Sequence, residues 1–161
     1  MSEDFTCREA VERDYDQLCA LEAELDSYHI QALPAFFQHY PGKARERSFF
    51  FPEPGEVQAV TFVAEKDHGL LGFICLGTRV SAPIPLLVPR KYAVIDSLYV
   101  TPKARRMGIA HRLMDLAETW SKQHGCSSIE LNVYAFNQNA LEFYRKEGFE
   151  DLSRKLTRKI N

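Results

Sequence analysis

The chain has 161 residues, of which 45% are hydrophobic and 26% charged, and its formal net charge is −2 at pH 7. This composition is ordinary for a soluble globular protein, so we expect a single domain over residues 1–161. The charge balance argues against a nucleic-acid partner, and no apolar run approaches the roughly 18 residues of a membrane span.

The N-terminal part predicts a short strand over residues 5–10 and then a helix capped by Asp14. The helix continues through positions at helical spacing, namely Leu18, Leu21, Glu22 and Leu25. A second helix is expected over residues 28–40, restarted near Pro34. Residues 41–56 are rich in proline, glycine and charge, which predicts a loop beside an acceptor site.

The middle of the chain predicts a hairpin of strands 57–65 and 70–80, turning through residues 66–69. Three prolines make residues 81–90 a surface connection, and residues 91–100 form the next strand. A helix then starts near Ile109, with Ile109, Leu113, Leu116, Ala117 and Trp120 on one stripe and Gly125 at its C-terminal end.

The last part predicts a strand over residues 128–134, a helix over residues 139–147 ended by Gly148, and a final strand over residues 149–160. The two strands that flank the helix after Ile109 are joined by a crossover and should be parallel. The expected fold class is therefore α/β, with a mixed sheet that contains one parallel crossover.

The segment from Ala93 to Ala110 is a strand, a short basic loop and the start of a helix. A helix N-terminus has unpaired N–H groups and a partial positive charge, and both suit a phosphate. Arg105 and Arg106 add charge, and Gly108 allows close approach. The chain has no Walker A loop and no dinucleotide-binding Gly-x-Gly-x-x-Gly, so the phosphate ligand belongs to another class.

Two motifs resemble those of the GNAT superfamily of N-acetyltransferases. The first is the acyl-CoA loop Arg105-x-x-Gly108-x-Ala110. The second, some 30 residues later, is Asn137-x-x-Ala140-x-x-Phe143-Tyr144-x-x-x-Gly148-Phe149. On these motifs the chain is identified as a member of that superfamily, with the resemblance good over residues 60–160 and loose over residues 5–40.

The resemblance implies a mostly antiparallel mixed sheet whose parallel central strands splay apart, flanked by helices. It implies acetyl-CoA as cosubstrate, with the pantetheine arm in the gap against the backbone of Leu98, Tyr99 and Val100. The pyrophosphate would lie on the loop residues Arg105, Arg106, Met107, Gly108, Ile109 and Ala110. Arg106 stands where the family commonly has glycine, as does Ala110.

Asp96 shares a strand face with apolar neighbours by the period of two, and burial there should raise its pKa. Its position resembles that of the general-base glutamate in polyamine acetyltransferases of the superfamily. Aspartate is one methylene shorter, so a water would mediate the proton transfer. The competing interpretation is that Asp96 caps a backbone bulge or bonds a loop.

By resemblance, Tyr144 protonates the departing thiolate and Asn137 bonds the pantetheine arm. A tyrosine on an apolar helix face is otherwise usually a core residue. Asn137 has a competing role as a helix cap, although Asn139 with Glu142 offers a better capping box. Tyr28 and His29 are candidate substrate contacts, because the N-terminal helices form a wall of the acceptor site in the superfamily.

The resulting hypothesis is an acetyl-CoA-dependent N-acetyltransferase that transfers directly to a primary amine. No cysteine stands at a motif position, and the four scattered cysteines show no metal-ligand spacing, so no metal is expected. The thiols and the acidic N-terminus without an apolar stretch indicate a cytoplasmic protein. The alternative is a non-catalytic acyl-CoA-binding sensor. The sequence leaves open which amine is the acceptor, including a protein N-terminus. It also leaves open whether a longer acyl group is transferred and whether the protein is a homodimer.

Overall fold

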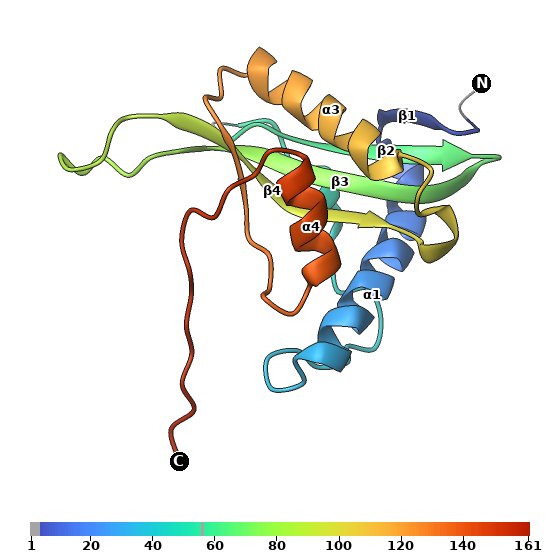
Figure 1. The fold of residues 1–161 in the computed structure, drawn as a ribbon. Coiled ribbons are helices and arrows are strands. Elements are labelled where there is room, and N and C mark those ends of the chain that lie inside the picture. The colour runs from blue at the N-terminus through green and yellow to red at the C-terminus, as the bar shows by residue number, and fades with distance from the viewer. Residues whose placement is uncertain (1–3, 56) are drawn as a thin grey trace.

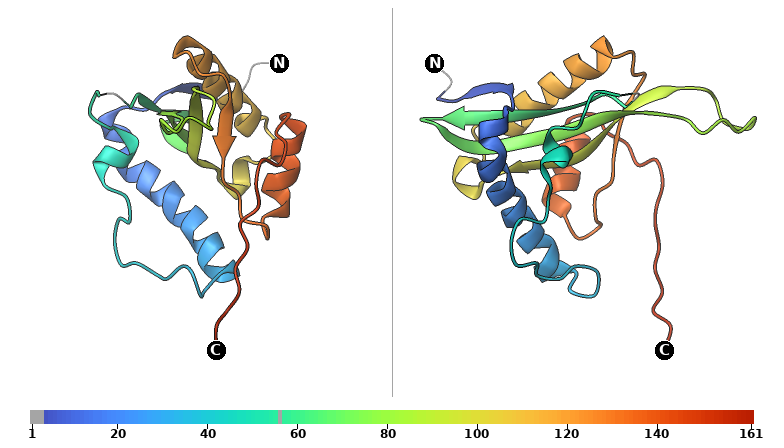
Figure 2. Two further views of the ribbon diagram at one scale, coloured as in Figure 1. Left: turned by 90° about the vertical axis from the view of Figure 1, so that its left-hand side faces the viewer. Right: turned by 180° about the vertical axis from the view of Figure 1, so that it is seen from behind.

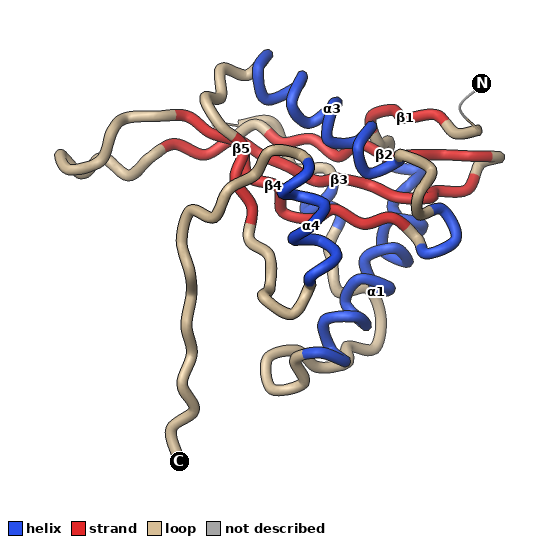
Figure 3. The backbone as a smooth tube through the Cα atoms, in the orientation of Figure 1, coloured by secondary structure: helices blue, strands red, loops and turns tan. Residues whose placement is uncertain are grey.

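The computed structural model describes residues 4–55 and 57–161, and within them a single five-stranded sheet with the order β1-β2-β3-β4-β5 (Figures 1 and 3). The strands are β1 (Thr6–Glu9), β2 (Ala59–Lys66), β3 (Gly69–Val80), β4 (Lys91–Val100) and β5 (Ile129–Leu131). Neighbours from β1 to β4 pair antiparallel, and β5 pairs parallel with β4. The predicted mixed, mostly antiparallel sheet with one parallel crossover is confirmed.

Two long helices cover opposite faces of this sheet, α1 (Tyr15–Ala32) on one side and α3 (Ile109–Gln123) on the other (Figures 1 and 2). The shorter helices are α2 (Arg47–Phe50) and α4 (Gln138–Lys146), and single 3₁₀ turns occupy Glu12–Asp14 and Pro102–Ala104. No helix in the described part of the chain is both long and apolar enough to cross a membrane.

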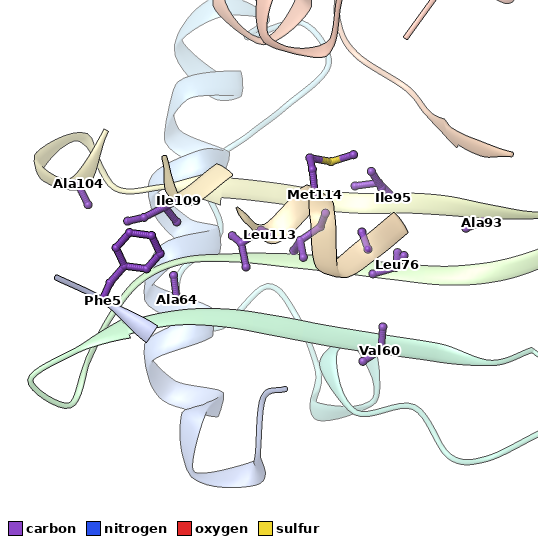
Figure 4. Close-up of a cluster of buried hydrophobic side chains, with 12 residues drawn as sticks. Phe5, Val60, Ala64, Leu76, Ala93, Ile95, Ala104, Ile109, Leu113 and Met114 are labelled. Atoms are coloured by element: carbon purple, nitrogen blue, oxygen red, sulfur yellow. The ribbon is translucent and has the colours of Figure 1, made fainter. Parts of the chain in front are cut away.

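The core on the α3 side forms as the apolar spacing of this helix predicts. Ile109 and Leu113 point onto the sheet, in one cluster with Leu76 and Ile95 (Figure 4). Ala117 belongs to the same cluster, and the three helix residues are at most 1% exposed. Burying a side chain of the size of leucine stabilises the fold by about 1.5–3 kcal/mol. This core therefore attaches the first turn of α3, and with it the basic loop, firmly to the sheet.

The core on the α1 side uses Leu18 and Leu21 from the helix and Val63 and Phe73 from the strands. It also takes Phe50, which is 1% exposed and comes from α2. The prediction that residues 41–56 are a loop is therefore only partly correct, because α2 lies within this segment and packs Phe50 into the core. Glu56, in the same predicted loop, lies outside the described residues.

The predicted second helix over residues 28–40 is wrong. α1 runs unbroken to Ala32, and Leu33 then leaves helical geometry with φ −132° and ψ 62°. Leu33 precedes Pro34, and the proline ring disfavours helical angles in the residue before it. The β2–β3 turn is confirmed as a tight one, since Asp67 and His68 both have positive φ, as in a type I′ turn.

The predicted strand over residues 149–160 is also wrong. Residues 150–161 belong to no helix or strand, each of them is exposed, and the segment runs away from the sheet (Figure 1). The predicted strand over residues 128–134 is shortened to β5, and α4 starts at Gln138 instead of residue 139. The predicted end of that helix is confirmed, because Gly148 adopts φ +88° directly after it.

Candidate active site

The parallel strands β4 and β5 separate after only three residue pairs. Pairing ends at Ile95 opposite Leu131. On the other side of β4, Ile95 pairs with Leu76 and Ser97 with the adjacent Cys75, which leaves Asp96 as the extra residue of a bulge. A bulge bends its strand and redirects side chains, and bulges are common beside active sites. The splayed strands that the resemblance implies are therefore present, and the separation begins at Asp96.

A cleft of about 280 Å³ opens where the strands separate. It is lined by residues of α1, β4, the end of β5, the chain after β5, and α4: Leu25, His29, Ile95, Asp96, Ser97, Leu98, Leu131, Asn132, Val133, Tyr134, Asn137, Ala140 and Tyr144. Five candidates from the sequence thus meet at one place although they are far apart in the chain, namely His29, Asp96, Leu98, Asn137 and Tyr144.

The backbone of β4 beyond the bulge presents to this gap an edge that does not pair with β5. The Thr101 N–H donates to the Leu71 carbonyl on the β3 side. Because backbone groups alternate along a strand, those of Leu98 and Val100 point the other way, where β5 no longer pairs. Tyr99 differs from its neighbours, since its side chain packs on the α1 side and its hydroxyl donates to Glu24 at 2.8 Å.

Asp96 lies at the cleft with a side chain that is 40% exposed and has one nearby counter-charge, Arg79 at 3.6 Å. Partial burial raises the pKa of this carboxyl, and the charge of Arg79 opposes the rise. The competing interpretation from the sequence is partly correct too, because Asp96 does occupy a bulge. A carboxylate that faces a cleft with its pKa raised above the ordinary value is a better proton acceptor than an exposed aspartate.

Tyr144 approaches the cleft from α4, with its ring 5.5 Å from that of Phe149. Burial raises the pKa of its hydroxyl to about 12. At neutral pH the group is therefore protonated and can donate.

Asn137 is the N-cap of α4, and its side-chain oxygen accepts a hydrogen bond from the Ala140 N–H at 3.2 Å. The prediction that Asn139 takes the capping role is wrong, because the helix starts at Gln138 and Asn139 is already inside it. Capping uses only the oxygen of Asn137, so its amide nitrogen can donate into the cleft.

The basic loop has a backbone that is bent to expose its N–H groups before α3. Arg106 and Gly108 both adopt positive φ, 66° and 82°, and Gly108 is the N-cap of α3. Arg105 donates from Nε to the Val100 carbonyl at 3.3 Å, which ties the loop to the end of β4. Arg106 and Met107 are exposed, Ala110 is half-buried, and Ile109 is in the core. The loop thus offers N–H groups and positive charge to an anion.

An aromatic cluster forms the α1 side of the cleft mouth. His29 lies 5.5 Å from Tyr134 and 5.4 Å from Phe37, measured between ring centroids, and Tyr28 lies 5.3 Å from Phe136. The Nδ1 of His29 is 3.0 Å from the Leu25 carbonyl, which can only accept, so Nδ1 carries the proton in this bond. The sequence indicated Tyr28 and His29, but Phe37, Tyr134 and Phe136 join them only through the fold.

Glu22 is a buried acid next to the cleft that the sequence interpretation left without a role. Its side chain is 2% exposed, its Oε1 has no hydrogen-bond partner, and Arg45 lies 3.5 Å from Oε2. Burial raises its pKa, opposed by hydrogen bonding to Ser97, which lines the cleft, and by the charge of Arg45. The signal in the sequence was an acid at core spacing between Leu21 and Leu25.

The described residues contain no group of three or more histidine, cysteine or acidic side chains placed to hold a metal ion. Cys75 lies near the cleft residues but is buried, and burial raises the pKa of its thiol far above the usual range. A thiol in that state is a poor nucleophile. The side chains of Asp96, His29 and Tyr144 line the cleft and can exchange protons with a bound molecule.

A family model described as the acetyltransferase (GNAT) family matches residues 21–149. The N-acetyltransferase MJ1207 of Methanocaldococcus jannaschii is 27% identical over 153 residues, covering 91% of this chain and 61% of that protein. The chain therefore spans about three fifths of the length of this relative.

Solved structures agree with the fold. A variant of the BH1408 protein of Bacillus halodurans has a TM-score of 0.88 at 22% identity, covering 97% of this chain and 99% of that one. The aminoglycoside N-acetyltransferase AAC(6')-Iy, solved with CoA, has a TM-score of 0.67 at 17% identity and covers 97% and 99%. By the family match and the splayed sheet, this chain belongs to the acetyltransferase (GNAT) family.

Proposed function

We propose that this protein transfers the acetyl group of acetyl-CoA to a primary amine bound in the cleft. The observation that carries the proposal is the meeting of Asp96, Asn137 and Tyr144 where β4 and β5 separate. The cleft then holds a proton acceptor from β4 together with an amide donor and a proton donor from α4 and its N-cap.

The chain has groups that fit acetyl-CoA. The backbone groups of Leu98 and the N–H of Val100, which face away from β3 beyond the paired part of β5, suit the amides of a pantetheine arm. The basic loop from Arg105 to Ala110 suits a pyrophosphate. The related fold of AAC(6')-Iy was solved with CoA, which supports the same ligand here. Bound acetyl-CoA supplies an acyl group activated as a thioester.

Asp96 takes the role of proton acceptor. A primary amine has a pKa near 10 and enters the site as an ammonium ion, so it must lose a proton before it can attack. The Asp96 carboxylate takes that proton through a bridging water, since its side chain is short. The Leu98 N–H donates a hydrogen bond to the carbonyl oxygen, where negative charge develops.

Tyr144 takes the role of proton donor. Its hydroxyl stays protonated at neutral pH and gives its proton to the sulfur that leaves as the C–S bond breaks. The nitrogen loses its second proton when the amide forms, and that proton restores the Tyr144 hydroxyl through solvent. Direct transfer between the two substrates is favoured, because the buried Cys75 thiol is a poor nucleophile.

The acceptor is an amine whose cation meets aromatic rings and acids. His29 and Tyr134 line the cleft, and a cation over such faces gains about 0.5–2 kcal/mol. The solved neighbours include aminoglycoside acetyltransferases, which places aminoglycosides among the amines to be tried together with polyamines, amino acids and peptide amines.

The test is release of free thiol from acetyl-CoA across a panel of these amines. The wild type is measured beside Asp96→Asn and Tyr144→Phe, which keep side-chain shape and remove the proton-transfer groups. We expect turnover on one class of amine, reduced at least tenfold in both variants while CoA binding by calorimetry is unchanged.

Two results would count against the proposal. Unchanged turnover in Tyr144→Phe with normal CoA binding would remove the proposed acid. Tight acetyl-CoA binding without turnover on any amine, peptide or protein acceptor would favour the acyl-CoA sensor.

A further inference from the structure

The charged groups of the cleft are few. Asp96 lies where β4 and β5 separate, and it is the one acidic side chain among the described residues that line the cleft. No lysine or arginine of the described chain lines it, and Arg79 beside the cleft already faces the Asp96 carboxylate at 3.6 Å. The cleft therefore has a partner for one positive charge and no cationic partner for a carboxylate.

Three acids in the middle of α1 are engaged with other residues. Glu22 and Asp26 face Arg45 at 3.5 and 3.0 Å. Glu24 accepts a hydrogen bond from the Tyr99 hydroxyl at 2.8 Å. A second ammonium group in the cleft would meet none of these carboxylates free, and an unpaired buried charge is costly. The charges therefore argue against polyamines and aminoglycosides, which carry several cations.

Two rings from α1 and from the chain after β5 line the same cleft, those of His29 and Tyr134, with centroids 5.5 Å apart. Phe37 lies 5.4 Å from each of them. Phe136 lies 5.6 Å from His29 and stacks on Tyr134 at 6.1 Å, with an angle of 25° between the rings. Aromatic pairs attract one another at these distances. The four rings form one cluster, called here the aromatic wall, and a bound molecule meets its His29 and Tyr134 part.

The aromatic wall is held in place without a ligand. The Nδ1 of His29 is 3.0 Å from the Leu25 carbonyl, which orients the imidazole ring. Tyr134 belongs to the chain after β5, which approaches the C-terminal end of α1 in Figures 1 and 2. Tyr134 is 46% exposed, so its ring is open to a ligand. A ligand ring would join this cluster without ordering new side chains, which favours binding.

The size of the cleft limits the acceptor. Its volume is about 280 Å³, just below the range of about 300–1,000 Å³ that is usual for ligand sites. In the proposed function the acyl end of acetyl-CoA takes part of this space, since Leu98, Asn137 and Tyr144 also line it. The remaining space suits a short amine with a single ring.

We propose that the acceptor is a small aromatic monoamine, which places its ammonium at Asp96 and its ring against His29 and Tyr134. The inference rests on the proposed function and names the class of amine for it. One carboxylate matches one ammonium, and the aromatic wall matches a ring. A carboxylate on the acceptor, as in an amino acid, would lack a cationic partner in the cleft.

The test is kcat/KM with acetyl-CoA for a set of matched amines. Phenethylamine is compared with butylamine, which lacks the ring, and with phenylalanine, which adds a carboxylate. Spermidine and an aminoglycoside add cations, and a short peptide that begins with phenylalanine presents the same ring on a peptide. We expect phenethylamine to exceed each of the others by about tenfold or more, because its ring gains apolar and aromatic contacts without an unpaired charge.

Tyr134→Leu removes one ring of the aromatic wall and keeps an apolar side chain. It should lower the preference for phenethylamine over butylamine about tenfold, mainly through KM, and weaken phenethylamine binding to the CoA complex by calorimetry. The matched control is Phe36→Leu, at an aromatic residue outside the wall that is 62% exposed, and it should leave the preference unchanged. Circular dichroism checks the folding of both variants.

The outcomes separate this inference from the function on which it rests. If any other member of the set were turned over as well as phenethylamine or better, the protein would be an N-acetyltransferase with another acceptor, and the inference would be wrong. An unchanged preference in Tyr134→Leu would overturn it too. If no amine released thiol from acetyl-CoA, the proposed function would fail together with the inference.

Discussion

Two groups of acidic side chains have opposite environments. One group surrounds Arg8, and the other lies near the cleft. In the Arg8 cluster (Arg8, Asp14 and Glu65), Arg8 contacts Asp14 at 2.7 Å and Glu65 at 2.9 Å. Hydrogen bonds from Arg8 are the main cause that lowers the pKa of both acids. Near the cleft, burial raises the pKa of Asp96 and of Glu22.

The difference separates acids that hold the fold together from acids available for chemistry. A carboxylate with strong donors is stable as an anion and has little tendency to take a proton. A carboxylate that is desolvated and weakly paired takes a proton more readily than an ordinary one, which costs stability while it is charged and favours a reactive site. The predictions below each test one side of this contrast.

The largest expected effect is on the cleft side. Asp96→Asn should lower kcat/KM by about 10²–10⁴ with little change in the free energy of unfolding, since the side chain is partly exposed. The rate for the wild type should rise with pH through an apparent pKa above the ordinary value of about 3.9, because the base works deprotonated. Steady-state pH profiles check this.

Arg79→Gln is the matched control for Asp96. It keeps the carboxyl and removes the charge that lowers its pKa, so the rising limb should move to higher pH. A profile that is unchanged in both variants would show that Asp96 is not the group that titrates.

The next effect belongs to the Arg8 cluster. Arg8→Ala removes the two side-chain donors of Asp14, whose side chain is 4% exposed, and leaves only the Val11 N–H, so it should lower the free energy of unfolding by about 2–3 kcal/mol. Urea denaturation measures this, with the exposed Arg13→Ala as control, expected within about 0.5 kcal/mol of the wild type. If the Arg8→Ala protein stayed stable but lost transfer activity, the Arg8 cluster would not be purely structural.

The pH dependence of stability should differ in sign between the two groups. For Asp14 the folded pKa is lowered, so its contribution is present above the ordinary pKa of about 3.9 and is lost as the pH falls through the lowered value. For Glu22 the folded pKa is raised. Its contribution is therefore full below about 4.3 and is lost as the pH rises through the raised value.

Glu22→Gln tests the pH dependence of stability expected for Glu22. The variant should gain about 1 kcal/mol relative to the wild type at neutral pH, because the wild type buries a charge with one unpartnered oxygen. The gain should shrink as the pH is lowered. A difference that stays constant from neutral to acidic pH would mean that Glu22 does not titrate in the folded protein.

The smallest effect concerns backbone strain in the basic loop before α3, which is a further contrast with the Arg8 cluster. Arg106 has φ 66°, and a left-handed non-glycine residue costs about 1–2 kcal/mol. Arg106→Gly should therefore raise the melting temperature slightly and weaken CoA binding at low salt. Gly108→Ala, at φ 82°, should lower the melting temperature, and a neutral result there would show that the loop relaxes.

The sequence correctly predicted the features that depend only on residues close together in the chain. The apolar stripe of α3, the tight turn at Asp67 and His68, and the helix end at Gly148 all follow from residue spacing or from conformations that few residues adopt. The motif around Arg105 and Gly108 likewise located the loop before α3, because one continuous stretch of chain carries all of it.

The errors arose where neighbours in space decide the structure. α1 runs on to Ala32, and no second helix follows near Pro34 as predicted. Phe50 is buried, although its segment has the composition of a loop. A final strand was predicted over residues 149–160, but a strand exists only when another strand pairs with it. Residues 150–161 pair with no strand among the described residues.

The sequence by itself determined the family, the class of fold and the residues of the two motifs, because these are encoded in short contiguous patterns. Only the tertiary structure decided that Asp96 is a bulge residue and that β4 and β5 separate there. It also placed His29 from α1 with Tyr134 and Tyr144 around one cleft. Strand pairing and packing between distant segments set those positions, and no local pattern contains them.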